Sequence, residues 1–323
     1  MKLLVAIPCL NEARTLADVI SAVPRNLDGI HRVDCLVIDD GSTDDTRAVA
    51  LAAGAEVISH RRSRGVGAAF QTGLERAIDG GYDLLVNIDG DGQFQPKDIA
   101  RLIAPIMRGE AAFVTASRFA PGGEARGISA IKRWGNHRMS TLVSGLTGSA
   151  FHDVSCGFRA YAREAMLRLN LHGSFTYTQE SFIDLSYKQI PIVEVPVTVQ
   201  YFEARRSRVA GSILRYAFKT FGIILRTYRD YYPVRFFWSL AAVLGATGAA
   251  LASIMLVHYL HTGAFSGQLW AGFTGGFLLT VALAFFLIGI IADILKGLRG
   301  NQERLLYYLR RERHERGQST PKR

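Results

Sequence analysis

Short apolar runs alternate with stretches of helical spacing along the first 110 residues. The apolar runs predict buried strands at residues 2–8, 35–38, 56–60 and 84–88. Apolar positions three or four apart predict helices at residues 12–23, 43–53, 67–79 and 98–108, with Asn11 as the expected cap of the first. Strands that alternate with helices indicate an α/β fold, in which helices cover both faces of a mostly parallel sheet.

The pattern loosens between residues 120 and 148. Pro121-Gly122-Gly123 opens a stretch rich in glycine and basic residues, which we interpret as a mobile loop that receives an acceptor. A last strand is predicted at residues 193–200.

Two long apolar runs dominate the last third of the chain. Residues 236–260 hold one ionisable side chain, His258, and residues 269–292 hold none. Each run is long enough to cross a bilayer. The loop between them lacks Lys and Arg, whereas both outer flanks are rich in them, so the positive-inside rule puts both termini in the cytosol. Residues 206–234 are predicted to lie in the membrane interface, and residues 305–316 to form a basic amphipathic helix on the inner leaflet.

The uneven distribution of charge along the chain supports a membrane location. The net charge is +10, but residues 1–204 carry 21 Lys and Arg against 23 Asp and Glu, whereas residues 205–323 carry 17 against 5. Because the excess flanks the apolar runs, we expect an anionic membrane surface rather than nucleic acid as its partner. Cys9, Cys35 and Cys156 have no zinc-type spacing and fit reduced thiols of a cytosolic domain.

Polar clusters follow three of the predicted strands: Asn11-Glu12, Asp39-Asp40 and Asp89-Gly90-Asp91. Ligands of parallel sheets bind at the carboxyl ends of the strands. Two carboxylates one residue apart suit Mg²⁺ or Mn²⁺ that takes its other ligands from phosphates and water. A helix cap and a tight turn are the plain alternatives for the second and third clusters.

The first two thirds of the chain, about residues 1–212, resembles family 2 glycosyltransferases of the GT-A fold, and within them the polyprenyl-phosphate glycosyltransferases of the dolichol-phosphate mannose synthase group. The matching stretches are Ile7-Pro8-Cys9-Leu10-Asn11-Glu12, Val37-Ile38-Asp39-Asp40-Gly41-Ser42-Thr43-Asp44, Arg64-Gly65-Val66-Gly67, Asp89-Gly90-Asp91-Gly92-Gln93, Ser117-Arg118-Phe119 and Asp153-Val154-Ser155-Cys156-Gly157-Phe158-Arg159. The paired apolar segments are similar to those of the membrane-anchored branch.

The resemblance implies a donor site for a nucleotide diphosphate sugar. Asp39 would bind the base and Asp40 would lie near the ribose, while Asp91 would bind the metal with help from Asp89 and Gln93. The other donor-binding residues that it implies are Pro8, Asn11, Glu12, Arg64, Gly65, Asp89, Gly90 and Asp153.

The acceptor side is implied less completely. Arg118 matches an arginine that binds the acceptor phosphate. The other basic candidates are Lys132, Arg133, Arg205, Arg206 and Arg208, for which plain attraction to the membrane is the alternative. The chain departs from the eukaryotic motif, because His137 replaces the serine after the basic pair. Glu180, or Asp184, would be a general base for a hydroxyl acceptor or would orient the sugar, and Arg159 is expected to pair with an acid.

These observations predict an inverting, metal-dependent hexosyltransferase that uses GDP-mannose or UDP-glucose and a dolichyl or undecaprenyl phosphate. A glycolipid or polysaccharide hydroxyl acceptor is one alternative, and a membrane scaffold that binds a nucleotide sugar without catalysis is another. We expect a cytosolic GT-A domain at 1–205, an interfacial segment at 206–234, a transmembrane hairpin at 235–292 and a basic cytosolic tail at 293–323, in a cell or ER membrane. Glycines 245, 248, 275 and 276 allow close packing between protomers in a homo-oligomer.

Overall fold

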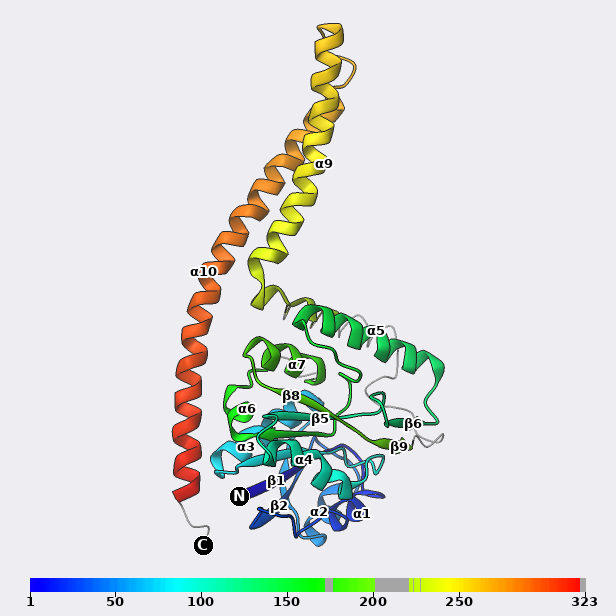
Figure 1. The fold of residues 1–323 in the computed structure, drawn as a ribbon, viewed down its shortest axis with the longest axis vertical. Helices are drawn as coiled ribbons and strands as arrows, with labels where there is room; N and C mark the ends of the chain where they lie inside the picture. Colours follow the sequence, from blue (N-terminus) through cyan, green and yellow to red (C-terminus); the bar gives the residue numbers. More distant parts are fainter. Residues whose placement is uncertain (172–176, 201–220, 223, 227, 320–323) are drawn as a thin grey trace. The chain divides into compact units, whose positions relative to one another are not determined.

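The computed structural model describes the whole chain except residues 172–176, 201–220, 223, 227 and 320–323. It divides into two compact units (Figure 1). We call Met1–Ile224 with Leu305–Arg323 the sheet unit, and Leu225–Arg304 the hairpin unit.

The sheet unit is built on seven strands in the order β3-β2-β1-β4-β7-β5-β8. All neighbours pair in parallel except those of β7, which runs antiparallel to β4 and β5. Apolar runs without alternation form these strands because both faces of the sheet are covered. The strands are β1 (Lys2–Cys9), β2 (Arg32–Asp39), β3 (Glu56–Ser59), β4 (Leu84–Asn87), β5 (Phe113–Ser117), β7 (Arg159–Ala162) and β8 (Ile192–Pro196).

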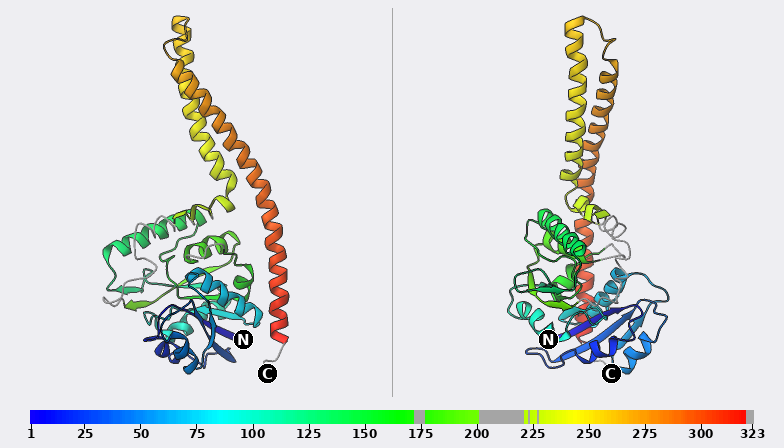
Figure 2. Two further views of the ribbon diagram at one scale, coloured as in Figure 1. Left: turned by 180° about the vertical axis from the view of Figure 1, so that it is seen from behind. Right: turned by 90° about the vertical axis from the view of Figure 1, so that its right-hand side faces the viewer.

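Helices pack on both faces of this sheet (Figure 2). Alternate residues of β1 share one core cluster with α1 and α4. On the other face, α3 approaches β1 and β2 closely, because a Cβ atom at Gly73 would lie 3.1 Å from Ala6 Cβ and 3.3 Å from Ile38 Cδ1. The helices are α1 (Leu16–Ser21), α2 (Thr46–Ala52), α3 (Val66–Asp79), η1 (Pro96–Asp98), α4 (Ile99–Met107), α5 (Ala130–Thr147), α6 (Arg163–Arg168) and α7 (Thr178–Tyr187).

Two predictions for this unit are wrong in their details. Most of the expected loop at 120–148 is the 18-residue helix α5, which begins at a Ser129 cap and ends at Gly148 in the left-handed conformation. The expected strand at 193–200 divides at Val197 between β8 and β9 (Thr198–Gln200), and β9 pairs with β6 (Glu124–Arg126) in a separate small sheet.

The hairpin unit contains α9 (Pro233–Thr262) and the first part of α10 (Leu269–Ser319). Both helices are long and apolar enough to cross a membrane, and only 6% and 11% of their most apolar windows are buried, so they are unlike the core helices of a soluble protein. Gly248 and Gly275 let the two helices meet, since a Cβ atom on either would lie within 3 Å of the other's carbonyl oxygen. These two glycines therefore pack α9 on α10 within one chain rather than between protomers.

The end of α10 packs against the sheet unit through buried polar side chains. Arg310 Nη1 donates to Leu169 O at 2.7 Å, and its Nη2 donates to Glu75 Oε1 at 3.1 Å. His314 is fully buried with Nε2 2.8 Å from Tyr82 O, and burial lowers its pKa. The prediction of a basic helix on the inner leaflet is therefore wrong for the face that carries these residues.

We expect Arg310→Met to lower the free energy of unfolding by about 3 kcal/mol, because it leaves the Leu169 carbonyl and its neighbours without a buried donor. Arg311→Met is the matched control: Arg311 is exposed and pairs with Glu315 one turn away, so the free energy of unfolding should hardly change. Urea unfolding of the detergent-solubilised chain, followed by tryptophan fluorescence, measures both. Equal stability of the two variants would contradict the docking role of Arg310.

Candidate active site at the carboxyl edge of the sheet

The three polar clusters meet where β1, β2 and β4 end. Ser42 Oγ accepts the Asn11 N–H at 2.9 Å, and Thr15 Oγ1 donates to Gly90 O at 2.8 Å. Asp40 N–H donates to Cys9 O at 2.9 Å. The loops after these strands are thus tied to one another, as the sequence predicted from the parallel sheet.

Asn11 has a different local role from the one predicted. It is in the left-handed region with φ +53°, and its side-chain oxygen accepts the Thr43 N–H at 2.7 Å. It is not a helix cap, because α1 begins only at Leu16 after a turn at Glu12–Thr15. Asn11 therefore joins the loop after β1 to the loop after β2, next to Glu12.

Asp39 and Asp40 organise the loop after β2. Asp39 Oδ1 accepts the Ser42 N–H at 2.8 Å. Asp40 accepts hydrogen bonds from His60, Ser63 and the backbone of Arg64 and Gly65, at 2.6 to 3.1 Å. Burial acts to raise the pKa of Asp40, but these hydrogen bonds outweigh it and hold the pKa below its usual value. The Asp40 carboxylate therefore fixes the Arg64-Gly65 turn, which is a way of shaping a nucleotide pocket.

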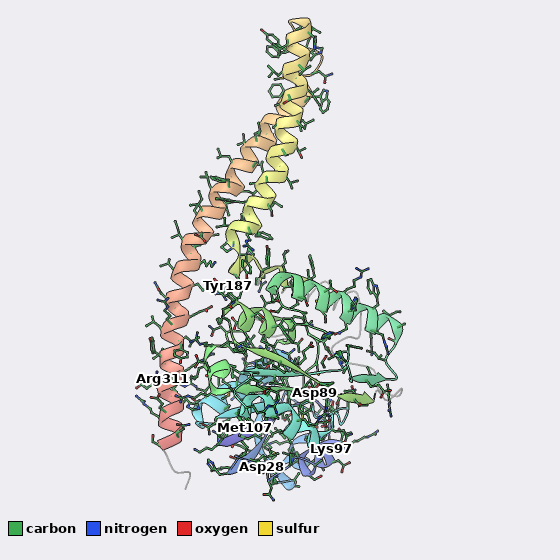
Figure 3. The ribbon with its side chains drawn as sticks, in the orientation of Figure 1. Asp28, Asp89, Lys97, Met107, Tyr187 and Arg311 are labelled. Carbon is green, nitrogen blue, oxygen red and sulfur yellow. The ribbon has the colours of Figure 1, made fainter. Side chains whose placement is uncertain are left out.

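Asp89 and Asp91 follow β4 (Figure 3 labels Asp89). Burial and the charge of Asp91 raise the pKa of Asp89 to about 7, while the charges of Arg118 and Arg159 act to lower it. Asp91 Oδ1 accepts the Gln93 N–H at 3.0 Å. Gly90 between them has no room for a side chain, since a Cβ atom would lie 2.5 Å from Cys9 Sγ.

This carboxylate pair fits a divalent cation shared with a diphosphate. Two half-buried like charges repel each other, and a cation between them would remove the repulsion that helps to raise the pKa of Asp89. Among the residues that the structure describes, no group of three His, Cys, Asp or Glu side chains forms a complete metal cage. A site with two carboxylates is what Mg²⁺ or Mn²⁺ needs when phosphates and waters supply the other ligands.

Arg118 and Asp153 form one buried unit. Arg118 Nε and Nη2 donate to the two Asp153 oxygens at 2.6 and 2.8 Å, and the Arg118 N–H donates at 3.1 Å. Glu194 on β8 in turn accepts the N–H groups of His152 and Asp153, both at 2.9 Å. Sequence spacing does not show this pairing, which joins a predicted acceptor residue to a predicted donor residue.

Arg159 differs from the prediction of an acid partner. It is fully buried, with Nε donating to Cys156 O at 2.7 Å and Nη2 to Val154 O at 3.1 Å. Its guanidinium lies 5.0 Å from the centre of the Phe182 ring, and none of its contacts within the described residues is a carboxylate. Its charge acts on Asp89 instead.

Helix α7 lies in the interior and carries Glu180, which is 4% exposed. Its neighbour Gln179 donates to Ser155 Oγ at 3.3 Å, which connects α7 to the segment that holds Asp153. Asp184 binds Lys188 Nζ at 2.8 Å and the Asn170 N–H at 3.0 Å. Asp184 therefore organises the chain before α7.

The basic acceptor candidates are distributed unevenly. Lys132 and Arg133 are exposed in the first turn of α5. Arg205, Arg206 and Arg208 lie outside the described residues. Pro8 is half-buried near the end of β1. Residues that sequence reasoning missed are His60, Ser63, Gly157 and Glu194, which act through contacts distant in the chain.

Gly157 abuts the Asp89 carboxylate. A Cβ atom at this position would lie 2.9 Å from Asp89 Oδ2 and 3.1 Å from Oδ1. We expect Gly157→Ala to displace that carboxylate and to weaken Mn²⁺ activation about tenfold, as other changes beside a metal ligand do. Gly145→Ala, where the added Cβ meets nothing within 4 Å, should leave it unchanged. Titration of activity with Mn²⁺ compares the two variants, and identical midpoints would show that the contact is not needed.

A mostly parallel sheet with this carboxylate pair at its carboxyl edge is the arrangement expected of a GT-A-type glycosyltransferase. The model of glycosyl transferase family 2 matches residues 4–169, so the chain belongs to that family. It is a glycosyltransferase, and its fold is an α/β GT-A fold followed by two apolar helices.

Several curated relatives are close in sequence. The chain is 34% identical over 224 residues to polyprenol monophosphomannose synthase from Mycolicibacterium smegmatis, covering 66% of this chain and 83% of that protein. It is 30% identical to glycosyltransferase AglJ from Haloferax volcanii, covering 91% and 94%, and 29% identical to undecaprenyl-phosphate mannosyltransferase from Micrococcus luteus, covering 66% and 90%.

A similar solved structure is glucosyl-3-phosphoglycerate synthase from Mycobacterium tuberculosis in complex with Mn²⁺, UDP-glucose and phosphoglyceric acid. The TM-score is 0.55 at 23% identity, over 70% of this chain and 79% of that one. This likeness supports the fold.

Proposed function

We propose that this protein transfers a hexose, with inversion, from a nucleotide diphosphate sugar to a polyprenyl phosphate. The observation that carries the proposal is that a pair of carboxylates and an arginine lie at the same edge of the sheet. The Asp89 and Asp91 carboxylates suit the cation of a sugar nucleotide, and Arg118, whose charge acts on Asp89, suits the acceptor phosphate.

The donor would occupy the loops after β1 and β2. Pro8, Asn11 and Glu12 line one side, and Asp39 accepts from the base. Asp40 holds Arg64 and Gly65 against the nucleotide through its hydrogen bonds, in addition to any contact with the ribose. Gly90 lets the backbone approach closely.

The acceptor phosphate oxygen attacks the anomeric carbon while the bond from that carbon to the diphosphate oxygen breaks. The electron pair of that bond leaves with the nucleoside diphosphate, and the configuration at the carbon inverts. Asp89 and Asp91, with Gln93 nearby, would hold a divalent cation, which would supply Lewis-acid neutralisation of the leaving diphosphate. Arg118, fixed by Asp153, positions the attacking phosphate against its repulsion from the diphosphate.

The role of Glu180 distinguishes a phosphate acceptor from the main alternative, a hydroxyl acceptor. A phosphate acceptor is already ionised at neutral pH and needs no general base, so Glu180 would orient the sugar or its neighbours. A hydroxyl acceptor would need a base, and Glu180 or Asp184 of α7 could act as one.

The membrane arrangement follows from charge. The loop between α9 and α10 lacks Lys and Arg, so we propose that it lies outside while the sheet unit and both termini are cytosolic. A lipid phosphate at headgroup level would then meet Lys132 and Arg133, together with Arg205, Arg206 and Arg208. The cell membrane, or the ER membrane in a eukaryote, is the expected location.

A radiolabel transfer assay in bilayers that contain undecaprenyl or dolichyl phosphate tests the proposal. Labelled GDP-mannose, UDP-glucose and UDP-N-acetylglucosamine are supplied in turn with Mn²⁺ or Mg²⁺. The relatives support mannose as the first choice, and a 28% identical relative is named for N-acetylglucosamine transfer to dolichyl phosphate. Label in a mild-acid-labile lipid is the expected result.

The rivals give different outcomes. Label in an acid-stable glycolipid, lost in Glu180→Gln, would overturn the phosphate acceptor in favour of a hydroxyl. If the nucleotide sugar binds but is not turned over with any acceptor, the remaining interpretation is a membrane scaffold that binds a nucleotide sugar without catalysis.

A further inference from the structure

Three residues that are distant in the chain form a closed hydrogen-bonded group next to Asp89. Asn87 is the last residue of β4, two positions before Asp89, and its side chain is fully buried. Asn87 Nδ2 donates to Gly157 O at 3.0 Å and to Tyr177 OH at 2.7 Å. Tyr177 OH in turn donates to Gly157 O at 3.2 Å. We call Asn87, Gly157 and Tyr177 the polar triad.

The pairing of two strands explains why Gly157 lies beside Asp89. β4 and β7 are antiparallel, and the last pair of their ladder is Asn87 with Arg159. Continuing that register by two positions would place Asp89 opposite Gly157. β4 ends before that point, and there the Gly157 carbonyl accepts the two hydrogen bonds of the polar triad. The triad therefore holds the two segments together where Asp89 leaves the sheet.

The Gly157 backbone limits the space of the Asp89 carboxylate. Because an added Cβ atom would lie 2.9 Å from Asp89 Oδ2, the main chain of Gly157 stands close to that oxygen. A shift of this peptide therefore changes where the carboxylate can lie. Since Asn87 and Tyr177 fix the Gly157 carbonyl, both side chains act on Asp89 through that peptide.

Tyr177 is itself firmly held. Its ring stacks on that of Phe70 in α3, with 4.1 Å between the ring centres and 2° between the planes. Burial raises the pKa of Tyr177 well above its usual value, so its hydroxyl remains protonated and keeps donating at neutral pH. Burying an amide and a hydroxyl costs free energy unless both are hydrogen-bonded, so packing alone would favour apolar side chains here.

We propose that Tyr177 and Asn87 are positioning residues for the Asp89 carboxylate. By holding the Gly157 peptide, they set the place from which Asp89 shares a divalent cation with Asp91. This inference rests on the proposed function, because the cation would be that of the sugar nucleotide. Both side chains are uncharged, so they determine where the carboxylate lies and add no charge to the site.

The alternative role of the polar triad is to fasten the start of α7 to the sheet. That role predicts a lower melting temperature and a loss of affinity for every ligand of the site. A positioning role predicts a loss that is confined to the cation, because only Asp89 is displaced. Measurements of cation and nucleotide binding therefore distinguish the two roles.

Binding of Mn²⁺ to the full-length protein in nanodiscs tests the proposal without any turnover. Free Mn²⁺ is measured by electron paramagnetic resonance in the presence of GDP or UDP. Tyr177→Phe keeps the ring that stacks on Phe70 and removes only the hydroxyl. We expect its dissociation constant for Mn²⁺ to rise about tenfold, as for other changes beside a metal ligand. Its affinity for the nucleotide without metal should not change.

Tyr161→Phe is the matched control. Tyr161 is a fully buried tyrosine of β7, with its ring centre 4.8 Å from that of Phe113, and it is not part of the polar triad. This variant should bind Mn²⁺ as the unchanged protein does. Asn87→Ala, which removes the other donor to Gly157 O, should weaken Mn²⁺ binding as Tyr177→Phe does and provides a second test.

Initial rates give a further readout. Tyr177→Phe should raise the Mn²⁺ concentration that gives half of the maximal rate, and should leave the rate at saturating Mn²⁺ nearly unchanged.

The proposal and the proposed function fail in different ways. Equal Mn²⁺ affinity of Tyr177→Phe and the unchanged protein would overturn the positioning role, and so would an equal loss of nucleotide affinity without metal. Either result leaves the transfer reaction standing. If the unchanged protein bound no Mn²⁺ with either nucleotide, the proposed cation site would fail together with this inference.

Discussion

Replacing Asp91 by asparagine is expected to lower the transfer rate about a thousandfold, which corresponds to about 4 kcal/mol of transition-state stabilisation. Asparagine keeps an oxygen that accepts the Gln93 N–H, so the turn should persist. What is lost is one of the two negative charges that would hold the cation against the leaving diphosphate.

The same change should make Asp89 easier to ionise, because the charge of Asp91 helps to raise the Asp89 pKa to about 7. A loss of activity therefore cannot come from protonation of Asp89. The measurement is initial rate against Mn²⁺ concentration, with donor binding followed separately. Asp28→Asn, at an exposed acid of the same unit, is the control. Unchanged turnover in Asp91→Asn would remove this residue from the metal site.

The Arg118→Met variant is expected to lose both activity and stability. Asp153 is fully buried and accepts two hydrogen bonds from the Arg118 guanidinium, so the variant leaves this buried carboxylate without its cationic partner, with only the backbone N–H groups of residues 118 and 155 donating to it. The free energy of unfolding should fall by about 3 to 5 kcal/mol. Turnover should fall at least about a hundredfold, because the acceptor phosphate loses its arginine.

A double variant separates the two effects. Arg118→Met with Asp153→Asn removes the stranded charge, so it should recover most of the stability but none of the activity. Thermal unfolding and label transfer on the same samples give both quantities. If activity returned with stability, Arg118 would be a structural partner of Asp153 and would play no part in acceptor binding.

The positions of the predicted catalytic and binding residues follow from strand pairing, whereas their hydrogen-bond partners depend on contacts distant in the chain. Asp39, Asp40, Asp89 and Asp91 come at or directly after strand ends, and parallel pairing alone brings such positions together. Their neighbourhood could therefore be predicted from the order of apolar runs. The hydrogen-bond partners of each carboxylate could not be predicted in this way. Asp40, for example, binds residues 20 to 25 positions away in the chain.

Local errors have a similar cause. Residues 130–147 lack a clear apolar stripe, and α5 forms because the Ser129 cap and the buried Asn136, Ser140 and Val143 hold it against the rest of the unit. The Ser140 hydroxyl ties α5 to the segment that follows it, since it donates to His152 O at 3.0 Å. Such polar contacts leave no hydrophobic period to detect.

The sequence by itself determined the alternating strands and helices, the carboxylates at the strand ends and the two apolar helices, because each depends on residues that are neighbours in the chain. Only the tertiary structure decided that Asp153 forms an ion pair with Arg118, that Arg159 is surrounded by aromatic rings, and that Arg310 packs the end of α10 against the rest of the sheet unit. Those contacts join residues 18 to 235 positions apart. Burial and packing select them, and no local spacing records them.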